Sequence, residues 1–243
     1  MLQLLLLTLA IGFVALLYSS VGHAGASGYI ATLTLFSYAP AVIKPTALVL
    51  NILVAVIGTV QFARAGHFSW KLFWPFALLS VPAAYLGGYL QLPSSVFKPL
   101  VGGVLFFSAA RLLFRKRDPE VISPPHLAVA LAVGAGIGLL SGLTGTGGGI
   151  FLTPLLLFCG WAGTRSAAAI SAPFILVNSI AGLVGHFSSG QPTPSFAWIL
   201  AIAVVAGGTP GSYLGSKRFP VRTITVMMAV VLVIAGAKLI FTS

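Results

Sequence analysis

Apolar residues occur in ten runs along the chain, separated by short polar or glycine-rich segments. A helix needs about 20 residues to cross the hydrocarbon core of a bilayer, and two of the runs have only about half that length. These two follow glycine-rich breaks and are predicted to be re-entrant or interfacial half-helices. The pattern predicts ten helices, over residues 2–20, 28–38, 43–64, 70–91, 97–114, 126–141, 149–160, 165–187, 194–215 and 221–241.

The composition restricts the class of protein. Apolar residues make up 58% of the chain, charged residues only 6%, and the mean hydropathy is +1.07. A water-soluble domain with a solvated surface does not have such values. The sequence therefore predicts an all-α polytopic membrane protein with about eight transmembrane segments, surrounded by the lipid bilayer.

Charged residues are few and unevenly placed. Asp118 and Glu120 are the only acidic residues, so every predicted span lacks a carboxylate. The net charge of +11 would suggest a nucleic-acid partner in a soluble protein, but here the basic residues lie mostly at the ends of apolar runs, where they report orientation. We expect no nucleic-acid partner. The single cysteine, Cys159, excludes an internal disulfide and a thiolate-rich metal site, and no metal or cofactor is expected.

The two halves of the chain share landmarks in a constant order when the chain is shifted on itself by roughly 120 to 128 positions. Asn51 falls on Asn178, Trp70 on Trp198, and Pro82 on Pro210. These matches predict two repeats, residues 1–116 and 126–243, joined by a cytoplasmic linker, residues 117–125, within one integral membrane domain. Because the first run recurs in the second half, residues 1–20 are interpreted as a helix rather than as a signal peptide.

The basic residues distinguish two layouts of each repeat. If the first run and the short run form one broken span, the thirteen basic residues divide seven to six between the two sides. If these runs form a hairpin, ten lie on one side, and only Lys44, Lys98 and Lys238 on the other. Cytoplasmic loops carry the Lys and Arg excess, so the hairpin is favoured. Each repeat then crosses an odd number of times, which predicts inverted repeats with both termini on the extracytoplasmic side.

Two glycine-rich breaks, Gly22–Gly28 and Gly142–Gly149, precede the two half-helices. Half-helices beginning at Tyr29 or Ile150 would direct free N–H groups and a positive dipole end toward a small oxyanion. Broken helices at matching positions of two halves are the usual sign of a transporter's binding site near the bilayer midplane. The alternative interpretation is that the glycines only permit close helix packing or tight turns.

Several polar side chains accompany these breaks. Ser27, Thr144 and Thr146 are candidate hydroxyl donors, and His23 is a candidate donor or proton carrier. Asn51 and Asn178 occupy equivalent positions, where each amide could orient a ligand or make an interhelical hydrogen bond. The predicted substrate-binding residues are His23, Gly25, Ser27, Gly28, Asn51, Thr144, Gly145, Thr146, Gly147, Gly148, Gly149 and Asn178.

With these residues in place, the chain resembles the sulfite exporter TauE/SafE family of bacterial membrane permeases over nearly its whole length. The run Gly142–Gly149 carries the strongest part of the resemblance, whereas Ala26-Ser27-Gly28 departs from the Gly-Gly-Gly form that the family often has there. The resemblance implies a multi-pass protein of the bacterial plasma membrane that moves sulfite, thiosulfate or a related organosulfonate.

The predicted direction is export and the predicted class is a transporter, not an enzyme. An inside-negative potential expels anions by about 2.3 kcal/mol per charge per 100 mV, and the spans contain no carboxylate for a coupling cation. A passive anion channel is the first alternative. An intramembrane serine protease is the second, because Gly25-Ala26-Ser27-Gly28 has the Gly-x-Ser-Gly form of rhomboid proteases. Gly102 and Gly103 are candidates for a homodimer contact or for packing inside one protomer.

Overall fold

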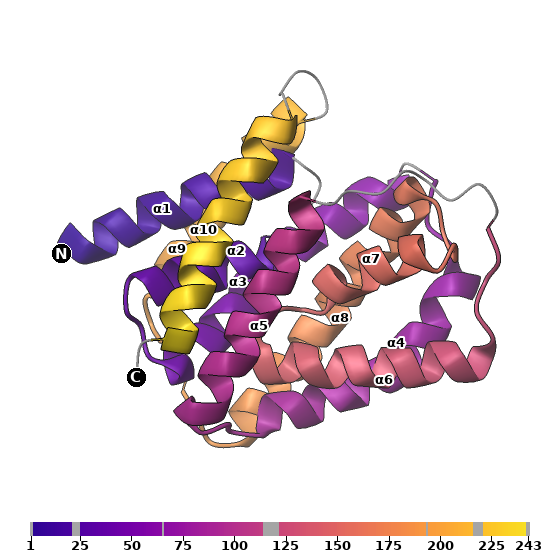
Figure 1. Cartoon of the computed structure of the whole chain (residues 1–243), viewed down its shortest axis with the longest axis horizontal. Helices are drawn as coiled ribbons and strands as arrows, with labels where there is room; N and C mark the ends of the chain where they lie inside the picture. Colours follow the sequence, from indigo (N-terminus) through magenta and orange to yellow (C-terminus); the bar gives the residue numbers. More distant parts are fainter. Residues whose placement is uncertain are drawn as a thin grey trace. The chain divides into compact units, whose positions relative to one another are not determined.

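Ten α-helices form in the part of the chain that the computed structural model describes, residues 2–20, 25–64, 66–113, 122–192, 194–215 and 221–241 (Figure 1). No β-strand occurs in these ranges. The all-helical prediction is confirmed. The helices are α1 (Leu2–Ser20), α2 (Ala26–Leu35), α3 (Pro40–Arg64), α4 (Trp70–Tyr89), α5 (Ser94–Leu113), α6 (Leu127–Thr144), α7 (Gly149–Phe158), α8 (Thr164–Ser188), α9 (Ala197–Gly215) and α10 (Val221–Phe241).

Five of the helices are long and apolar enough, over their described residues, to cross a membrane: α1, α3, α4, α6 and α8. Shorter apolar stretches lie in α5, α7, α9 and α10. The helices α2 and α7 have 10 residues each, the half-length that the pattern predicts. The number of eight spans and the inverted orientation of the halves stay predictions.

The start of α2 differs from its prediction. This helix begins at Ala26, one turn before Tyr29, whereas α7 begins at Gly149, next to the predicted Ile150. The reason lies in the residues before each start. A helical glycine is less favourable than alanine by about 1 kcal/mol, so Gly147 and Gly148 delay the start of α7, while Ala26 and Ser27 allow α2 to begin.

The helices form two compact units. The first unit comprises Met1–Val54, Leu92–Arg115 and Thr193–Ser243, and the second comprises Ala55–Gln91 and Lys116–Pro192. Each unit takes helices from both halves of the sequence. The helix α4 of the first half packs with α6 and α8 of the second half, and α9 of the second half packs with α1 of the first. We call this arrangement the helix exchange.

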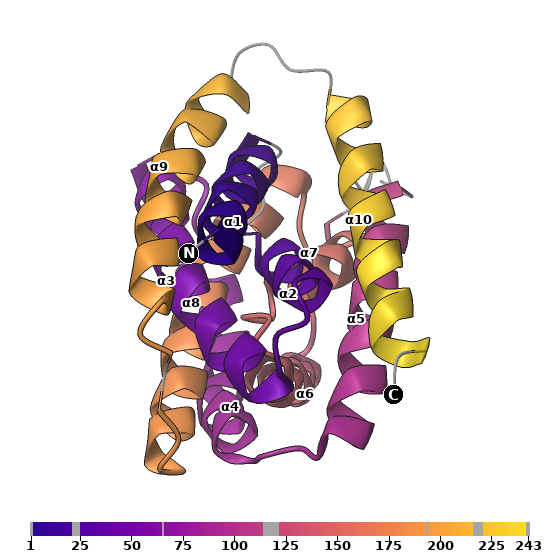
Figure 2. The same ribbon diagram turned by 90° about the vertical axis from the view of Figure 1, so that its left-hand side faces the viewer.

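In the first unit, α1 packs along α9, and α5 packs along α10 (Figure 2). The short helix α2 contacts α1, α5 and α10, and it is buried over nearly all its length. Glycines bring two of these pairs close: Gly207 of α9 lies against the backbone of Gly12, and Gly102 of α5 lies against Gly236 and Ile240 of α10. Gly102 therefore packs inside the protomer, whereas Gly103 is exposed.

In the second unit, α4 lies side by side with α6 (Figure 1) and also contacts α8. The short helix α7 packs antiparallel to α8, because Gly149 lies against Ile175 and Thr153 bonds to Ser171. The apolar core of this unit includes Phe76, Leu152 and Phe174, all fully buried. These contacts hold the beginning of α7 against α8.

Candidate functional site

The first glycine break ends at Gly25, which caps the N-terminus of α2 in the left-handed conformation, with φ 77° and ψ −2°. Glycine adopts this conformation without strain, unlike residues that carry a Cβ atom. Gly28 lies against Val14 and Tyr18 of α1, so close that a Cβ atom there would be 2.6 Å from the Val14 side chain. The first turn of α2 therefore lies close to α1, because Gly28 has no side chain.

Three backbone N–H groups begin this helix without an acceptor inside it, as at any helix N-terminus. They belong to Ala26, Ser27 and Gly28, whereas the N–H of Tyr29 donates to the Gly25 carbonyl at 3.0 Å. The sequence-based expectation that the free groups start at Tyr29 is therefore wrong. They precede it, because α2 begins one turn earlier.

The side chains beside these groups are buried. Ser27 shares a hydrogen bond of 3.0 Å with the hydroxyl of Tyr18, and Thr32 donates to the Gly28 carbonyl. Tyr29 and Asn51 are fully buried in the same unit. His23, another predicted site residue, lies outside the described residues.

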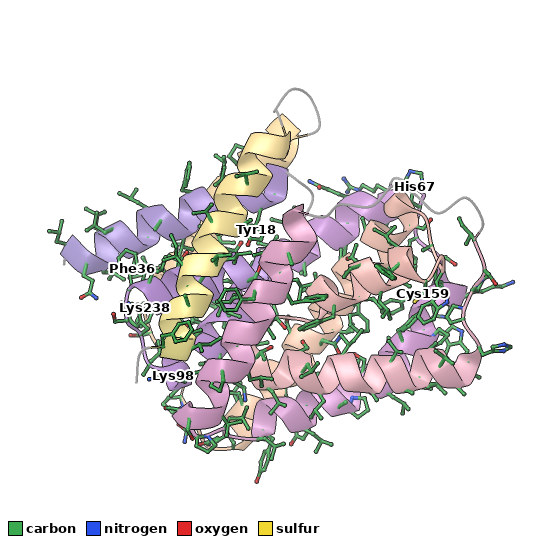
Figure 3. The ribbon with its side chains drawn as sticks, in the orientation of Figure 1. Tyr18, Phe36, His67, Lys98, Cys159 and Lys238 are labelled. Carbon is green, nitrogen blue, oxygen red and sulfur yellow. The ribbon has the colours of Figure 1, made fainter. Side chains whose placement is uncertain are left out.

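The C-terminal end of α2 is held by a cation. The Lys238 ammonium group, on α10, donates to the Leu35 carbonyl at 2.9 Å and to the Ser37 hydroxyl at 2.8 Å. Figure 3 labels Lys238 beside Phe36, the residue between these two partners. A cation at a helix C-terminus satisfies free carbonyls and complements the dipole. Lys238 therefore fixes the half-helix from the end opposite to its free N–H groups.

The second break is an irregular segment between α6 and α7. Gly145 ends α6 with φ 81°, and Gly148 caps α7 with φ 83°. Gly147 also has a positive φ, 72°. The N–H groups of residues 146–150 make no hydrogen bond to another group of the described chain, while those of Phe151 and Leu152 donate to the Gly148 carbonyl. The segment therefore offers a row of backbone donors.

The threonine hydroxyls of this break make hydrogen bonds to groups of the break itself and of the end of α6. Thr144 donates to the Leu140 carbonyl at 2.6 Å, and 3.0 Å separates its oxygen from that of Thr146. Because a hydroxyl has one proton, Thr146 must be the donor in the second of these bonds. Neither threonine has a hydroxyl proton left for a ligand in this geometry. Their contribution is to stiffen the loop that carries the backbone N–H groups.

One buried amide points at the second break. Ser80 of α4 donates to the Oδ1 atom of Asn178, and the Nδ2 atom of Asn178 makes no hydrogen bond. This nitrogen would lie 3.5 Å from a Cβ atom on Gly148, and side-chain atoms of Phe174 and Ile137 would lie 2.9 and 3.0 Å from that Cβ atom. A buried amide nitrogen is a strong donor that normally has a partner. Asn178 is therefore poised as a donor beside the free N–H groups.

The structure brings the predicted residues together in two sets. Gly25, Ser27 and Gly28 form the N-terminus of α2 in the first unit, which also contains Asn51. Asn178 lies at the beginning of α7 in the second unit, beside the predicted residues Thr144, Gly145, Thr146, Gly147, Gly148 and Gly149. No group of three His, Cys, Asp or Glu side chains that could hold a metal occurs among the described residues.

Sequence reasoning missed three side chains of these sets. Tyr18 and Tyr29 lie at the first break, and Ser80 orients Asn178 at the second. Serines and tyrosines are common in apolar helices, so only the packing of α1 and α4 identifies them. Lys44, one of the three basic residues that the hairpin layout places on the outer side, is only 7% exposed.

Comparisons with known proteins point to one family. A sequence model of the family described as Sulfite exporter TauE/SafE matches residues 6–239. The chain is 44% identical over 240 residues to the "Probable membrane transporter protein y4hK" of Sinorhizobium fredii, covering 96% of this chain and 97% of that protein. It is 26% identical over 250 aligned positions to the "Probable membrane transporter protein YjnA" of Bacillus subtilis, covering 94% and 96%. No solved structure matches the chain.

Proposed function

Because the chain belongs to the sulfite exporter TauE/SafE family of membrane transporters, we propose that it exports small sulfur oxyanions, and that backbone N–H groups at its glycine breaks bind them. Sulfite, thiosulfate and small organosulfonates are the candidate substrates. All present several oxygen acceptors on one small centre, which is the ligand that a cluster of backbone donors fits.

The observation that carries this proposal is the donor set at the second break. Free N–H groups of residues 146–150 and the Asn178 Nδ2 atom lie together without an acceptor. Leaving buried donors unpaired costs about 1–3 kcal/mol each, so such a cluster is expected where a ligand supplies the acceptors. An anion is favoured because α7 also presents the positive end of its dipole here.

The proposed direction follows from charge. The membrane segments contain no Asp or Glu that could bind a coupling proton or cation, since both acidic residues lie at positions 118 and 120. An inside-negative potential drives an anion outward by about 2.3 kcal/mol per charge per 100 mV. Export therefore needs no coupling ion, whereas uptake against the potential would.

The test is efflux from proteoliposomes loaded with radiolabelled sulfite, with a potassium diffusion potential of either sign. We expect efflux that is faster when the interior is negative. Absence of efflux under both signs would overturn the transport proposal. Replacing Gly148 by valine should abolish binding of sulfite, because a side chain at φ 83° is strained and would lie 2.9 Å from Phe174.

Gly190→Val is the matched control for this variant. Gly190 also has a positive φ, 76°, but no atom lies within 4 Å of the position of its Cβ atom. It therefore reproduces the backbone strain without filling the break. Binding that survives in Gly148→Val, or that is lost equally in Gly190→Val, would remove the second break from the site.

A passive channel is the second candidate, because the same donors would also line a pore. Single-channel currents across planar bilayers distinguish the two, since a carrier conducts too slowly to give resolved openings. The protease alternative is disfavoured. The Ser27 hydroxyl is hydrogen-bonded to the phenol of Tyr18, and relatives are named as transporters.

We also propose the inverted two-repeat layout with both termini outside the cytoplasm. The helix exchange supports it, because the fourth helix of each half packs with the first helix of the other.

A further inference from the structure

The hydroxyl of Tyr29 lies beside the N-cap of α2, its own helix. Helical side chains lean toward the N-terminus of their helix, and the Tyr29 ring lies back over the N-cap of α2. A Cβ atom on Gly25 would be only 2.7 Å from both the Cζ and Oη atoms of Tyr29. The hydroxyl is therefore beside the residue that precedes the free N–H groups of Ala26, Ser27 and Gly28.

The hydroxyl of Tyr29 is fully buried and makes no hydrogen bond within the described chain. Buried phenol groups usually have a partner, and leaving one without it destabilises the folded state. Tyr18, packed nearby, shows the usual situation, because its hydroxyl bonds to Ser27. A Phe at position 29 would fill the same apolar space. The hydroxyl is thus unexplained by packing.

From these contacts we propose that the Tyr29 hydroxyl donates a hydrogen bond to the sulfur oxyanion at the N-terminus of α2, as the side-chain ligand of the first glycine break. This inference rests on the proposed function and extends it. The backbone N–H groups bind oxygens on one side of the anion, and the phenol binds an oxygen on another. Each break then has one buried side-chain donor, a phenol in the first and the Asn178 amide in the second.

The arrangement also explains why Gly25 has no side chain. Any Cβ atom at this position would displace the Tyr29 hydroxyl in addition to straining the backbone at φ 77°. Gly25 and Tyr29 therefore depend on each other, because the phenol of Tyr29 occupies the space that a side chain at position 25 would need. Tyr29 is a specificity-determining residue in this proposal because its donor has one fixed direction.

The test is Tyr29→Phe, which removes one oxygen and keeps the ring. In the absence of anion, we expect the variant to melt at the temperature of the wild-type protein or above it, because the unpartnered hydroxyl is gone. Sulfite and thiosulfate should bind about 10- to 100-fold more weakly, the effect of one hydrogen bond to a charged group. Thermal unfolding in detergent and binding of radiolabelled sulfite measure the two effects.

Tyr38→Phe is the matched control. Tyr38 belongs to the same unit, lies beyond the other end of α2, and packs against Phe196 in a tilted arrangement with 5.2 Å between the ring centroids. We expect wild-type affinity in this variant. If, in the absence of anion, the melting temperature of Tyr29→Phe is below that of the wild-type protein, the hydroxyl already has a partner in the protein. The inference would then be wrong.

The outcomes separate this inference from the function on which it rests. Wild-type affinity in Tyr29→Phe together with lost binding in Gly148→Val would overturn the role of Tyr29 and keep the transporter proposal. If neither the wild-type protein nor any variant binds sulfite or thiosulfate, both the role of Tyr29 and the transporter proposal would be overturned. Weaker binding in Tyr29→Phe, with unchanged binding in Tyr38→Phe, is the expected result.

Discussion

Asn178 illustrates how one buried side chain can serve both packing and ligand binding. Its Oδ1 atom accepts from Ser80, which fixes the orientation of the amide, and its Nδ2 atom is left facing Gly148. Removing one partner of a buried hydrogen bond costs more than removing both, because a lone acceptor keeps its desolvation penalty. The two roles of Asn178 can therefore be separated by a pair of substitutions.

We expect Ser80→Ala to destabilise the protein by about 1–3 kcal/mol, because it leaves the Asn178 Oδ1 atom buried without a donor. The double variant Ser80→Ala/Asn178→Leu should recover most of that loss. Sulfite binding should be weak in Asn178→Leu and in the double variant alike. Chemical unfolding and binding measured on the four proteins of the cycle check this expectation. Equal stability of Ser80→Ala and the double variant would contradict it.

Close backbone packing organises the elements of the second unit. Gly134, Gly138 and Gly142 recur every four residues on α6, and each lies against a carbonyl of α4. Small residues at this spacing allow two membrane helices to approach closely, where van der Waals contacts replace the absent hydrophobic driving force. Complementary shape and van der Waals contacts therefore stabilise the α4–α6 pair. Gly142 belongs both to this packing and to the glycine break.

Gly138 and Gly136 give a matched test of this packing. A Cβ atom at Gly138 would be 2.7 Å from the Ser80 Cα atom, whereas no atom lies within 4 Å of that position at Gly136. We expect Gly138→Ala to destabilise the protein by about 1–3 kcal/mol through overpacking. Gly136→Ala should stabilise it by up to about 1 kcal/mol through helix propensity. Melting temperatures that shift in the same direction for both variants would count against close α4–α6 contact.

The elements were largely predictable from the sequence, but their partners were not. Apolar runs and glycine breaks located the ten helices of the described residues, because helix length and helix interruption are local properties. Which helices pack together depends on which side of each helix faces its neighbour. In lipid the exposed side of a helix is as apolar as the packed side, so the sequence does not distinguish them. On α1, Leu7 is buried and Leu9 is 62% exposed, although the residue type is the same. For that reason the helix exchange, and with it the positions of Tyr18 and Ser80, required the structure.

In the candidate site, too, the local features were predictable from the sequence and the packing was not. The glycines at 25, 145, 147 and 148 were identified correctly as breaks, because a positive φ at a helix boundary favours that residue type. The role assigned to Tyr29 as the first helical residue was wrong, since α2 already begins at Ala26. Whether the predicted residues bind an anion stays a prediction.

At the scale of the whole molecule, the helix exchange makes each half of the chain depend on the other. The first half supplies α4 to the second unit, and the second half supplies α9 and α10 to the first unit. Neither residues 1–116 nor residues 117–243 contain a complete unit. The predicted linker, residues 117–125, therefore does not mark a boundary between the two compact units.

This dependence predicts the behaviour of a split chain. Residues 1–116 and 117–243 expressed separately should each be degraded or aggregate, because α4 lacks α6 and α1 lacks α9. Coexpression of the two pieces should restore sulfite efflux from cells or vesicles. Immunoblots of the membrane fraction and efflux of radiolabelled sulfite measure the two results. One piece that accumulates and melts cooperatively by itself would contradict the prediction.

The helix exchange also has a consequence for how the chain enters the membrane. During translation, α1 leaves the ribosome long before α9, the helix along which it packs. For that interval α1 must persist in lipid without its partner. Its sequence suits this period, because its 18-residue apolar segment has a mean hydropathy of 2.2 and large side chains such as Leu5, Leu9 and Phe13 still face outward in the finished protein. Assembly of the first unit is therefore a late event, completed only when the second half of the chain has been inserted.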